Sequence, residues 1–204
     1  MYLVKSVTRL SALINIDKMY NHSRYRQGSV GYAVAGYGYS TESSSSFTES
    51  SSDAPPLVYT DGCCFRNGRG LPAAGYGIWW GEDDERNQCG PLLGKYPTNN
   101  QAELVAVLLA IEQAIELEYE SLTICTDSTY VMNAFTEWIG NWKENGWTNS
   151  RGNPVKNQNL IRQIDGLMED IDVDFEHVTA HDGVYGNECA DALAKTGAAE
   201  HPNF

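Results

Sequence analysis

The strongest constraint on the fold is the order in which strand-like and helical patterns follow one another after Leu57. Three runs of alternating or β-branched apolar residues, at 57–66, 75–80 and 88–96, are separated only by short polar turns. Strands joined by such short connections pair as antiparallel neighbours. This part of the chain therefore predicts a three-stranded antiparallel meander.

The pattern then changes to helices that alternate with strands. Leu104, Leu108, Ile111 and Ile115 recur at helical spacing and predict a helix that begins near Asn99. The other predicted elements are a strand at 121–127, helices at 128–136, 137–144 and 160–168, a strand at 171–178 and a helix at 186–199. Strands that alternate with helices become parallel neighbours through right-handed crossovers. The predicted fold class is α/β, a mixed five-stranded sheet with flanking helices, in which strands 1–3 are antiparallel and strands 1, 4 and 5 are parallel.

The residues before Leu57 differ from this pattern in composition. Residues 1–40 are basic and rich in Ser, Tyr and Gly, whereas residues 41–56 are rich in Ser and end in Ala-Pro-Pro. The Ser-rich run at 41–56 cannot bury enough apolar surface to order itself. We expect 1–40 to be a disordered tail, with mitochondrial targeting as the alternative. We further expect a linker at 41–56, a globular domain at 57–199 and a C-terminal tail at 200–204.

The charge of the chain limits the partners that it can bind. The net charge is −13, and because residues 1–56 carry five basic and four acidic side chains, residues 57–204 carry −14. Neutralising phosphates requires Lys and Arg, so an acidic domain is a poor general binder of nucleic acid. If the partner is nucleic acid, bound metal must supply part of the positive charge.

The cysteines indicate the compartment. There are five of them, an odd number, and no two form a Cys-x-x-Cys pair. This pattern favours reduced thiols inside a cell over a disulfide framework or a zinc site. We expect the nucleus or cytoplasm, or the mitochondrion if the basic segment is a targeting signal. No apolar run approaches the roughly 18 residues of a membrane span, so we expect no membrane partner.

Four carboxylates occupy positions where the pattern predicts buried surroundings. Asp61 and Asp127 each follow a Thr at the end of a strand-like run, and open α/β sheets bind ligands at the carboxyl ends of neighbouring strands. Glu103, in the first turn of its predicted helix, and Asp191, in the last helix, share helix faces with Val and Ala residues. A single Asp-Gly pair usually only turns the chain, and an acid at a helix start can serve the helix dipole alone.

Together the four acids favour a metal site. Converging buried carboxylates would repel one another, and each costs several kcal/mol to desolvate, unless divalent cations lay among them. Carboxylate oxygens favour Mg²⁺ or Mn²⁺ over zinc. Two such ions about 4 Å apart can hold the attacking and leaving oxygens of an in-line phosphoryl displacement.

Four motifs resemble those of type 1 ribonuclease H in order and spacing. They are Tyr59-Thr60-Asp61-Gly62, Thr98-Asn99-Asn100-Gln101-Ala102-Glu103, Thr126-Asp127-Ser128 and His181-Asp182-Gly183-Val184-Tyr185-Gly186-Asn187-Glu188-Cys189-Ala190-Asp191. The similarity covers 57–199. It implies a metal-dependent endoribonuclease that hydrolyses the RNA strand of RNA/DNA hybrids by a two-metal-ion mechanism, with 5′-phosphate and 3′-hydroxyl ends as products.

The resemblance also implies roles for single residues. Asp61, Glu103, Asp127 and Asp191 would be the ligands of two Mg²⁺ ions, for which Mn²⁺ could substitute, and Asp61 would bridge the two. His181 would transfer protons in water activation or product departure, a role that suits an imidazole with an ordinary pKa of about 6.5. The resemblance implies no small-molecule cofactor, and we expect a monomer.

Contacts with the hybrid are implied by position as well. The expected substrate-binding residues are Asn99 and Gln101 at the minor groove and ribose, Thr98 and Asn157 at a phosphate of the DNA strand, Cys63, Cys64 and Asn67 just after the first strand, and Trp138 and Trp142 as an aromatic wall against deoxyribose. Each small polar residue could equally be a cap or a turn residue, and the tryptophans could instead pack their segment against the core. We expect packing for Trp147.

The sequence departs from the family pattern in several places. Residues 139–146 hold one Lys and one Glu where the family is usually basic, so we expect low non-specific affinity for duplexes. Residues 1–56 show no hybrid-binding domain, so we do not expect processive cutting. Lys95 is shifted relative to the basic residue of the family's phosphate-site loop, and Asp182 places an extra acid beside His181. That acid could raise the pKa of the histidine or add a metal contact.

Two other functions compete with this interpretation. A catalytically silent hybrid-binding module would need more Lys and Arg, and the intact set of acids argues against it. A DNA-cutting nuclease of the same fold, such as a junction resolvase or integrase core, is disfavoured by Gly186-Asn187-Glu188 and by the Trp-bearing segment.

Overall fold

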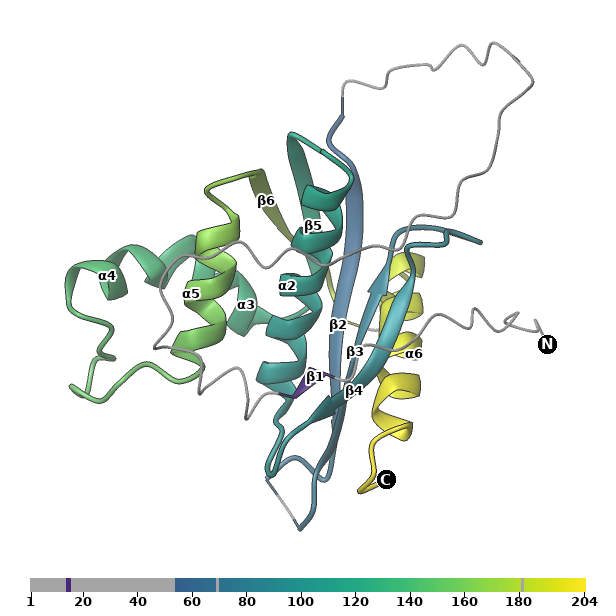
Figure 1. Ribbon diagram of the computed structural model, residues 1–204, viewed down its shortest axis with the longest axis horizontal. Helices are drawn as coiled ribbons and strands as arrows, with labels where there is room; N and C mark the ends of the chain where they lie inside the picture. Colours follow the sequence, from purple (N-terminus) through teal and green to yellow (C-terminus); the bar gives the residue numbers. More distant parts are fainter. Residues whose placement is uncertain (1–13, 16–53, 69, 181) are drawn as a thin grey trace, which may run out of the picture.

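The protein is built around one sheet with helices on both faces (Figure 1). The computed structural model describes residues 14–15, 54–68, 70–180 and 182–204. The strands are β1 (Ile14–Asn15), β2 (Leu57–Phe65), β3 (Ala73–Trp79), β4 (Gln88–Leu93), β5 (Ser121–Thr126) and β6 (Asp172–His177). The helices are α2 (Asn99–Glu116), α3 (Thr129–Asn133), η1 (Ala134–Trp138), α4 (Ile139–Glu144), α5 (Gln158–Leu167) and α6 (Tyr185–Ala199). None of the helices in these ranges is long and apolar enough to cross a membrane.

The strands lie in the order β1-β4-β3-β2-β5-β6. β2, β3 and β4 form the antiparallel meander, and β2, β5 and β6 are parallel. The predicted five-stranded mixed sheet is therefore confirmed. β1 is an addition, because Ile14 and Asn15 pair in parallel with Leu92 and Leu93 of β4. These two residues belong to the segment predicted to be a disordered tail, and the rest of that segment lies outside the described residues.

The region after β5 also differs in detail from the predicted pair of helices. A π-helical turn, η1, lies between the short helices α3 and α4, so three helical segments follow one another directly. The wider π turn shifts the register of side chains between α3 and α4. It places Phe135 in the core while Trp138 stays 37% exposed.

The main hydrophobic core lies between the sheet and α2. Val58, Ile78 and Ile124 of the strands and Leu104 and Ile111 of α2 are fully buried. Side chains along a strand alternate between the two faces of a sheet. In the register of these strands, Val58, Ile78 and Ile124 all point to the face that α2 covers. α5 closes the outer side of this layer through Leu160, Ile161 and Ile164, which are also fully buried.

On the opposite face of the sheet, α6 packs against glycine backbone. A Cβ atom on Gly77 would lie 2.5 Å from the backbone nitrogen of Ala194, and one on Gly75 would lie 2.7 Å from its carbonyl oxygen. Gly197 meets Gly90 of β4 in the same way. Contacts this close require glycine, since any side chain would force the helix outward. The four glycines thus set the height of α6 above β3 and β4.

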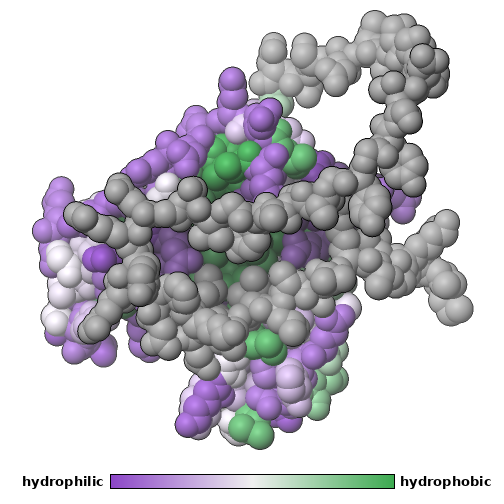
Figure 2. All heavy atoms as spheres, viewed as in Figure 1, coloured by the Kyte–Doolittle hydropathy of each residue, from purple (hydrophilic) through white to green (hydrophobic). Residues whose placement is uncertain are grey.

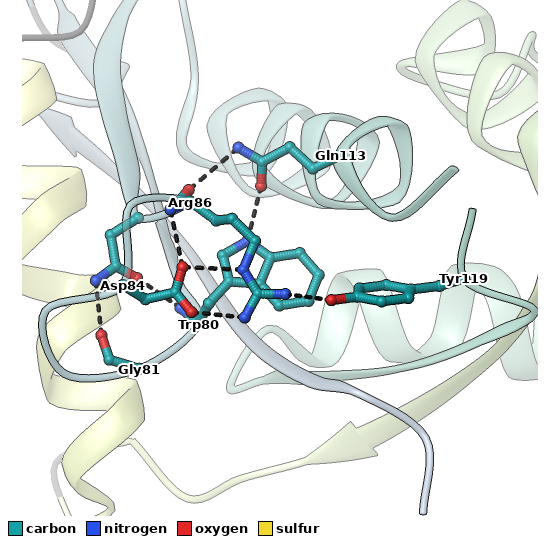
Figure 3. A network of polar contacts seen from close by, with 7 residues as sticks. Trp80, Gly81, Asp84, Arg86, Gln113 and Tyr119 are labelled. Atoms are coloured by element: carbon teal, nitrogen blue, oxygen red, sulfur yellow. Dashed lines mark hydrogen bonds and ion pairs between the residues drawn. The ribbon is translucent and has the colours of Figure 1, made fainter. Parts of the chain in front are cut away.

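The turn between β3 and β4 is tied to the C-terminal end of α2 by a network around Arg86 (Figure 3). Its guanidinium group lies 4.3 Å from the centre of the Trp80 ring, pairs with Asp84 at 2.5 Å and donates to the Tyr119 hydroxyl at 2.8 Å. The indole Nε1 of Trp80 donates to Gln113 Oε1 at 2.7 Å. These contacts neutralise the charge of Asp84 and give the turn a structural role.

The last residues and the last strand border the sheet. The predicted C-terminal tail is packed, since His201 is buried, Asn203 Nδ2 donates to the Pro72 carbonyl and Phe204 contacts the Phe65 ring at 5.0 Å. β6 forms one edge of the sheet, and its acidic side chains, Asp172, Asp174 and Glu176, are exposed.

Candidate active site

Two neighbouring parallel strands bring Asp61 and Asp127 to the same region. β2 and β5 are paired in register from Leu57 with Thr123 to Tyr59 with Cys125. Asp61 follows two residues later within β2 and is 8% exposed, and its Oδ1 accepts from the Gly62 amide at 2.7 Å. Asp127 directly follows the end of β5. In the structure Asp61 lies in the middle of β2, and Asp127 lies just past the end of the neighbouring strand β5.

Glu103 reaches the same region from α2. The Thr98 side chain and Gln101 form a capping box that starts the helix, and Glu103 lies one turn further along, not in the predicted first turn. It is 9% exposed. A Cβ atom on Gly62 would lie 2.6 Å from the carbonyl carbon of Ala102. Glycine after Asp61 thus allows the start of α2 to approach β2 closely.

Two neutral side chains hold the Glu103 carboxylate. Asn99 Nδ2 donates to Oε1 at 2.7 Å, and Ser128 Oγ donates to Oε2 at 2.5 Å. Ser128 also accepts from the Val131 amide and caps α3. Both oxygens of Glu103 are therefore fixed in direction. The predicted contact of Asn99 with substrate must share its amide with this carboxylate.

The other two acids have partners on α6. Asn187, which is 3% exposed, donates from Nδ2 to Asp127 Oδ2 at 3.0 Å, while its own Oδ1 is buried without a hydrogen-bond partner. Asp191 pairs with Lys195 one helical turn away at 2.6 Å. Neither Asn187 nor Lys195 was identified from the sequence as part of the site.

The four acids share one electrostatic environment. Burial, followed by the neighbouring charge of Asp127, raises the pKa of Asp61 to about 7. The charges of Asp191 and Glu103 add to this rise, and the hydrogen bond from the Gly62 amide opposes it. Burial also raises the pKa of Glu103, with Asp127 adding to the effect and the Ser128 and Asn99 hydrogen bonds opposing it. The carboxylates are thus close enough to oppose one another's ionisation.

The chemistry of this set fits a hard divalent cation. All four ligand candidates supply carboxylate oxygens, and burial first and the neighbouring carboxylates second raise the pKa of Asp61, two effects that a bound cation would oppose. Among the described residues, no three His, Cys, Asp or Glu side chains stand together as a formed metal-binding group. Glu103, Asp127 and Asp191 instead bind the protein partners named above. Metal binding would therefore require small rotations of these side chains.

A pocket of about 340 Å³ lies beside the site, next to the start of α2. The described residues that line it are Asn67, Thr98, Asn100, Gln101, Lys156 and Asn157. Four of them were predicted to contact substrate, and Asn100 and Lys156 were missed. The Thr-x-x-Gln spacing of the sequence indicates a capping box, in which the Gln101 side chain is committed to the helix start. Its neighbour Asn100 is then the amide left to face the pocket. Lys156 simply precedes the predicted Asn157.

The cysteines and tryptophans fall into separate places. Cys63 and Cys64 are not among the described residues that line the pocket. Cys64 donates to the Pro97 carbonyl, and burial and the charge of Asp61 raise the pKa of Cys63 to about 11. The Trp138 and Trp142 rings lie 5.5 Å apart on η1 and α4. Trp147 is buried, as predicted, beneath the guanidinium group of Arg162. Figure 2 shows mainly hydrophilic side chains at the α4 end of the molecule.

His181 lies outside the described residues. Asp182, next to it, is exposed, and no contact with the four carboxylates is resolved for it. The proposed proton-transfer role of the histidine therefore remains a prediction from the sequence.

Comparisons with known proteins show one family. The model of the RNase H family matches residues 53–199. Ribonuclease H of Schizosaccharomyces pombe is 44% identical over 144 residues, which cover 71% of this chain and 53% of that protein. Ribonuclease H of Alcanivorax borkumensis is 40% identical over 151 residues, which cover 71% of this chain and 91% of that protein. The solved RNase H domain of prototype foamy virus is 28% identical with a TM-score of 0.53, over 70% of this chain and 93% of that one. The chain spans about half the length of the fission yeast relative.

Proposed function

We propose that this chain, which belongs to the ribonuclease H family, hydrolyses the RNA strand of RNA/DNA hybrids. The observation that carries the proposal is the shared site of Asp61, Glu103, Asp127 and Asp191, in which the pKa of the buried Asp61 is raised to about 7. Carboxylates gathered in this way can bind divalent cations, which in turn can bind a phosphate group. The products would carry 5′-phosphate and 3′-hydroxyl ends.

The four carboxylates are the proposed ligands of two Mg²⁺ ions, for which Mn²⁺ could substitute. When bound, the ions would supply the positive charge that the attacking and leaving oxygens of a phosphoryl transfer require. The chain's own residues set the direction of the ligands. Ser128 and Asn99 orient Glu103, and Asn187 orients Asp127. Lys195 neutralises Asp191 until a cation replaces it.

Selection of a hybrid is proposed to come from contacts with both strands. Asn99 and Gln101 lie at the start of α2, two turns or less from Glu103, and are proposed to contact the minor groove and the ribose 2′-hydroxyls of the RNA strand. The 340 Å³ pocket is proposed to take a phosphate of the DNA strand. The exposed Trp138 and its neighbour Trp142 are proposed to pack against deoxyribose, which lacks the 2′-hydroxyl.

The experiment that tests the function compares three end-labelled duplexes of one sequence, RNA/DNA, RNA/RNA and DNA/DNA. Each is incubated with Mg²⁺, with Mn²⁺ or with chelator. We expect cleavage of the RNA in the hybrid alone, and only with metal. Binding of the hybrid without cleavage would support the silent module, and cleavage of DNA would support a nuclease of the same fold.

Replacing Asn187 with Ala should raise the Mg²⁺ concentration for half-maximal cleavage by about 10- to 100-fold, because groups that orient a metal ligand affect metal affinity on this scale. Asp127 would lose its amide donor at 3.0 Å. The checks are a Mg²⁺ titration of cleavage and the shift in melting temperature caused by Mn²⁺. Asn203→Ala removes a similar amide contact, to the Pro72 carbonyl, and should leave the Mg²⁺ midpoint unchanged. If Asn187→Ala and Asn203→Ala had the same Mg²⁺ midpoint, Asn187 would not be the group that orients Asp127 for metal binding.

A further inference from the structure

Tyr130 stands between the pocket and the tryptophans, which are the two features assigned above to the DNA strand. It belongs to α3, is half-buried and was not selected by the sequence analysis. Its hydroxyl contacts the loop that leads into α5, and its ring contacts η1. One side chain therefore touches both features.

The hydroxyl holds two consecutive residues of the pocket wall. Asn157 Nδ2 donates to Tyr130 Oη at 3.3 Å, and Tyr130 Oη donates to the Lys156 carbonyl oxygen at 3.3 Å. Asn157 has a φ of 58°, in the left-handed region. Asn adopts this conformation more easily than most residues, although it still costs free energy. The Tyr130 hydroxyl is thus placed to stabilise a strained corner of the wall.

The ring of Tyr130 continues into the aromatic pair. It meets the Trp138 ring edge to face at 6.2 Å, and Trp138 meets Trp142 at 5.5 Å. Edge-to-face contacts of this kind fix the orientation of both rings. A displacement of Tyr130 would therefore move the aromatic pair relative to the pocket.

The pocket wall also determines which charge the pocket can accept. Lys156 is the one charged side chain among the described lining residues, and no described acid lines the pocket. Lys95, the basic residue considered from the sequence, instead lies 5.4 Å from the Tyr96 ring and is not part of the lining. An anion such as a phosphodiester group therefore fits the pocket, with Lys156 as its cation.

We propose that Tyr130 is a positioning residue that sets the spacing between the Lys156–Asn157 wall and the Trp138–Trp142 pair, so that a DNA phosphate and a nearby deoxyribose bind as one unit. The proposal rests on the proposed function and deepens it. Lys156 supplies the charge of this unit, and the Tyr130 hydroxyl supplies its geometry. Both residues are placed at the pocket and the aromatic pair, so we expect them to act on binding of the hybrid and not on the hydrolytic step.

The test is Tyr130→Phe, which removes the hydroxyl and keeps the ring. One net hydrogen bond corresponds to about a 3- to 10-fold change in affinity, so we expect KM for the hybrid to rise by this factor with kcat unchanged. The dissociation constant measured by anisotropy of a labelled hybrid in chelator should rise equally. Tyr119→Phe, which loses a hydroxyl contact with Arg86 far from the site, should leave KM and the dissociation constant unchanged.

Two further variants separate the proposal from a general loss of structure. In an Asn157→Ala background, Tyr130→Phe should have a smaller additional effect, because one of the two hydroxyl partners is already absent and only the Lys156 carbonyl remains. Lys156→Met should lower the slope of log affinity against log salt by about 0.9, the value for one phosphate contact. If wild type cleaves the hybrid but Tyr130→Phe leaves KM unchanged, or lowers kcat and the melting temperature together, the positioning role is overturned. If wild type neither cleaves nor binds the hybrid, the proposed function itself fails.

Discussion

Asp127→Asn should abolish cleavage while leaving the metal-free protein at least as stable as wild type. The substitution removes one charge from the proposed metal ligands, and a loss of about 4 kcal/mol in the transition state corresponds to about a 1000-fold lower rate. The same charge raises the pKa of Asp61, second only to burial. Without it, the remaining buried acids repel one another less. Single-turnover cleavage and thermal unfolding in chelator measure the two effects.

The free energy of unfolding of the metal-free protein should fall as the pH rises toward 7. Because the pKa of Asp61 is raised to about 7 from an ordinary 3.8, the folded state holds this proton more tightly than the unfolded state. The contribution of Asp61 to stability is therefore full below the unfolded pKa and is lost as pH rises toward 7. In Asp127→Asn we expect the free energy of unfolding to fall less steeply with rising pH than in wild type. Asp172→Asn, on the exposed edge strand, should leave both cleavage and this slope unchanged. Retained activity in Asp127→Asn would refute the metal-ligand assignment.

Gly77→Ala should disrupt both stability and activity through the position of α6. The new methyl group would press on the Ala190 carbonyl oxygen and lie 2.5 Å from the Ala194 nitrogen. Overpacking of this kind costs about 1–3 kcal/mol, and backbone atoms on a packed helix have little room to relax. The helix must move outward, and it carries Asp191 and Asn187 with it. We expect a lower melting temperature and strongly reduced cleavage.

A second glycine provides the matched control. Gly166 lies in α5, and a Cβ atom there would meet no atom within 4 Å. Gly166→Ala should raise stability by up to about 1 kcal/mol through helix propensity, with unchanged cleavage. If Gly77→Ala melts and cleaves like wild type, then close contact with β3 does not determine where α6 lies.

The sequence predicted the sheet because its signals are periodic and local. Apolar alternation and helical spacing over 57–199 were sufficient for the order of elements and for the strand neighbours. β1 was missed because two residues are too few to show a period, and their pairing with Leu92 and Leu93 depends on an edge that exists only after folding. The π turn η1 was missed for a related reason, since its wider spacing resembles a break between two helices.

The acids of the candidate site stand out in the sequence, whereas their hydrogen-bond partners do not. Asp61, Glu103 and Asp127 are identifiable because a carboxylate in a buried pattern is conspicuous. Ser128 and Asn187 are not, because small polar side chains are common at helix starts, and only the fold shows which acid each one contacts. Tyr130 carries an apolar ring at a helical position, so its hydroxyl gave no signal.

The two edges of the sheet are protected against association in different ways. One edge, at β4, is occupied by the chain's own residues 14 and 15. The other, at β6, exposes Asp172, Asp174 and Glu176 at every second position. A second copy that added a strand there would bring like charges side by side, which disfavours pairing. Solubility at high concentration therefore depends on three carboxylates that take no part in the chemistry, and acid conditions that neutralise them would remove this protection first.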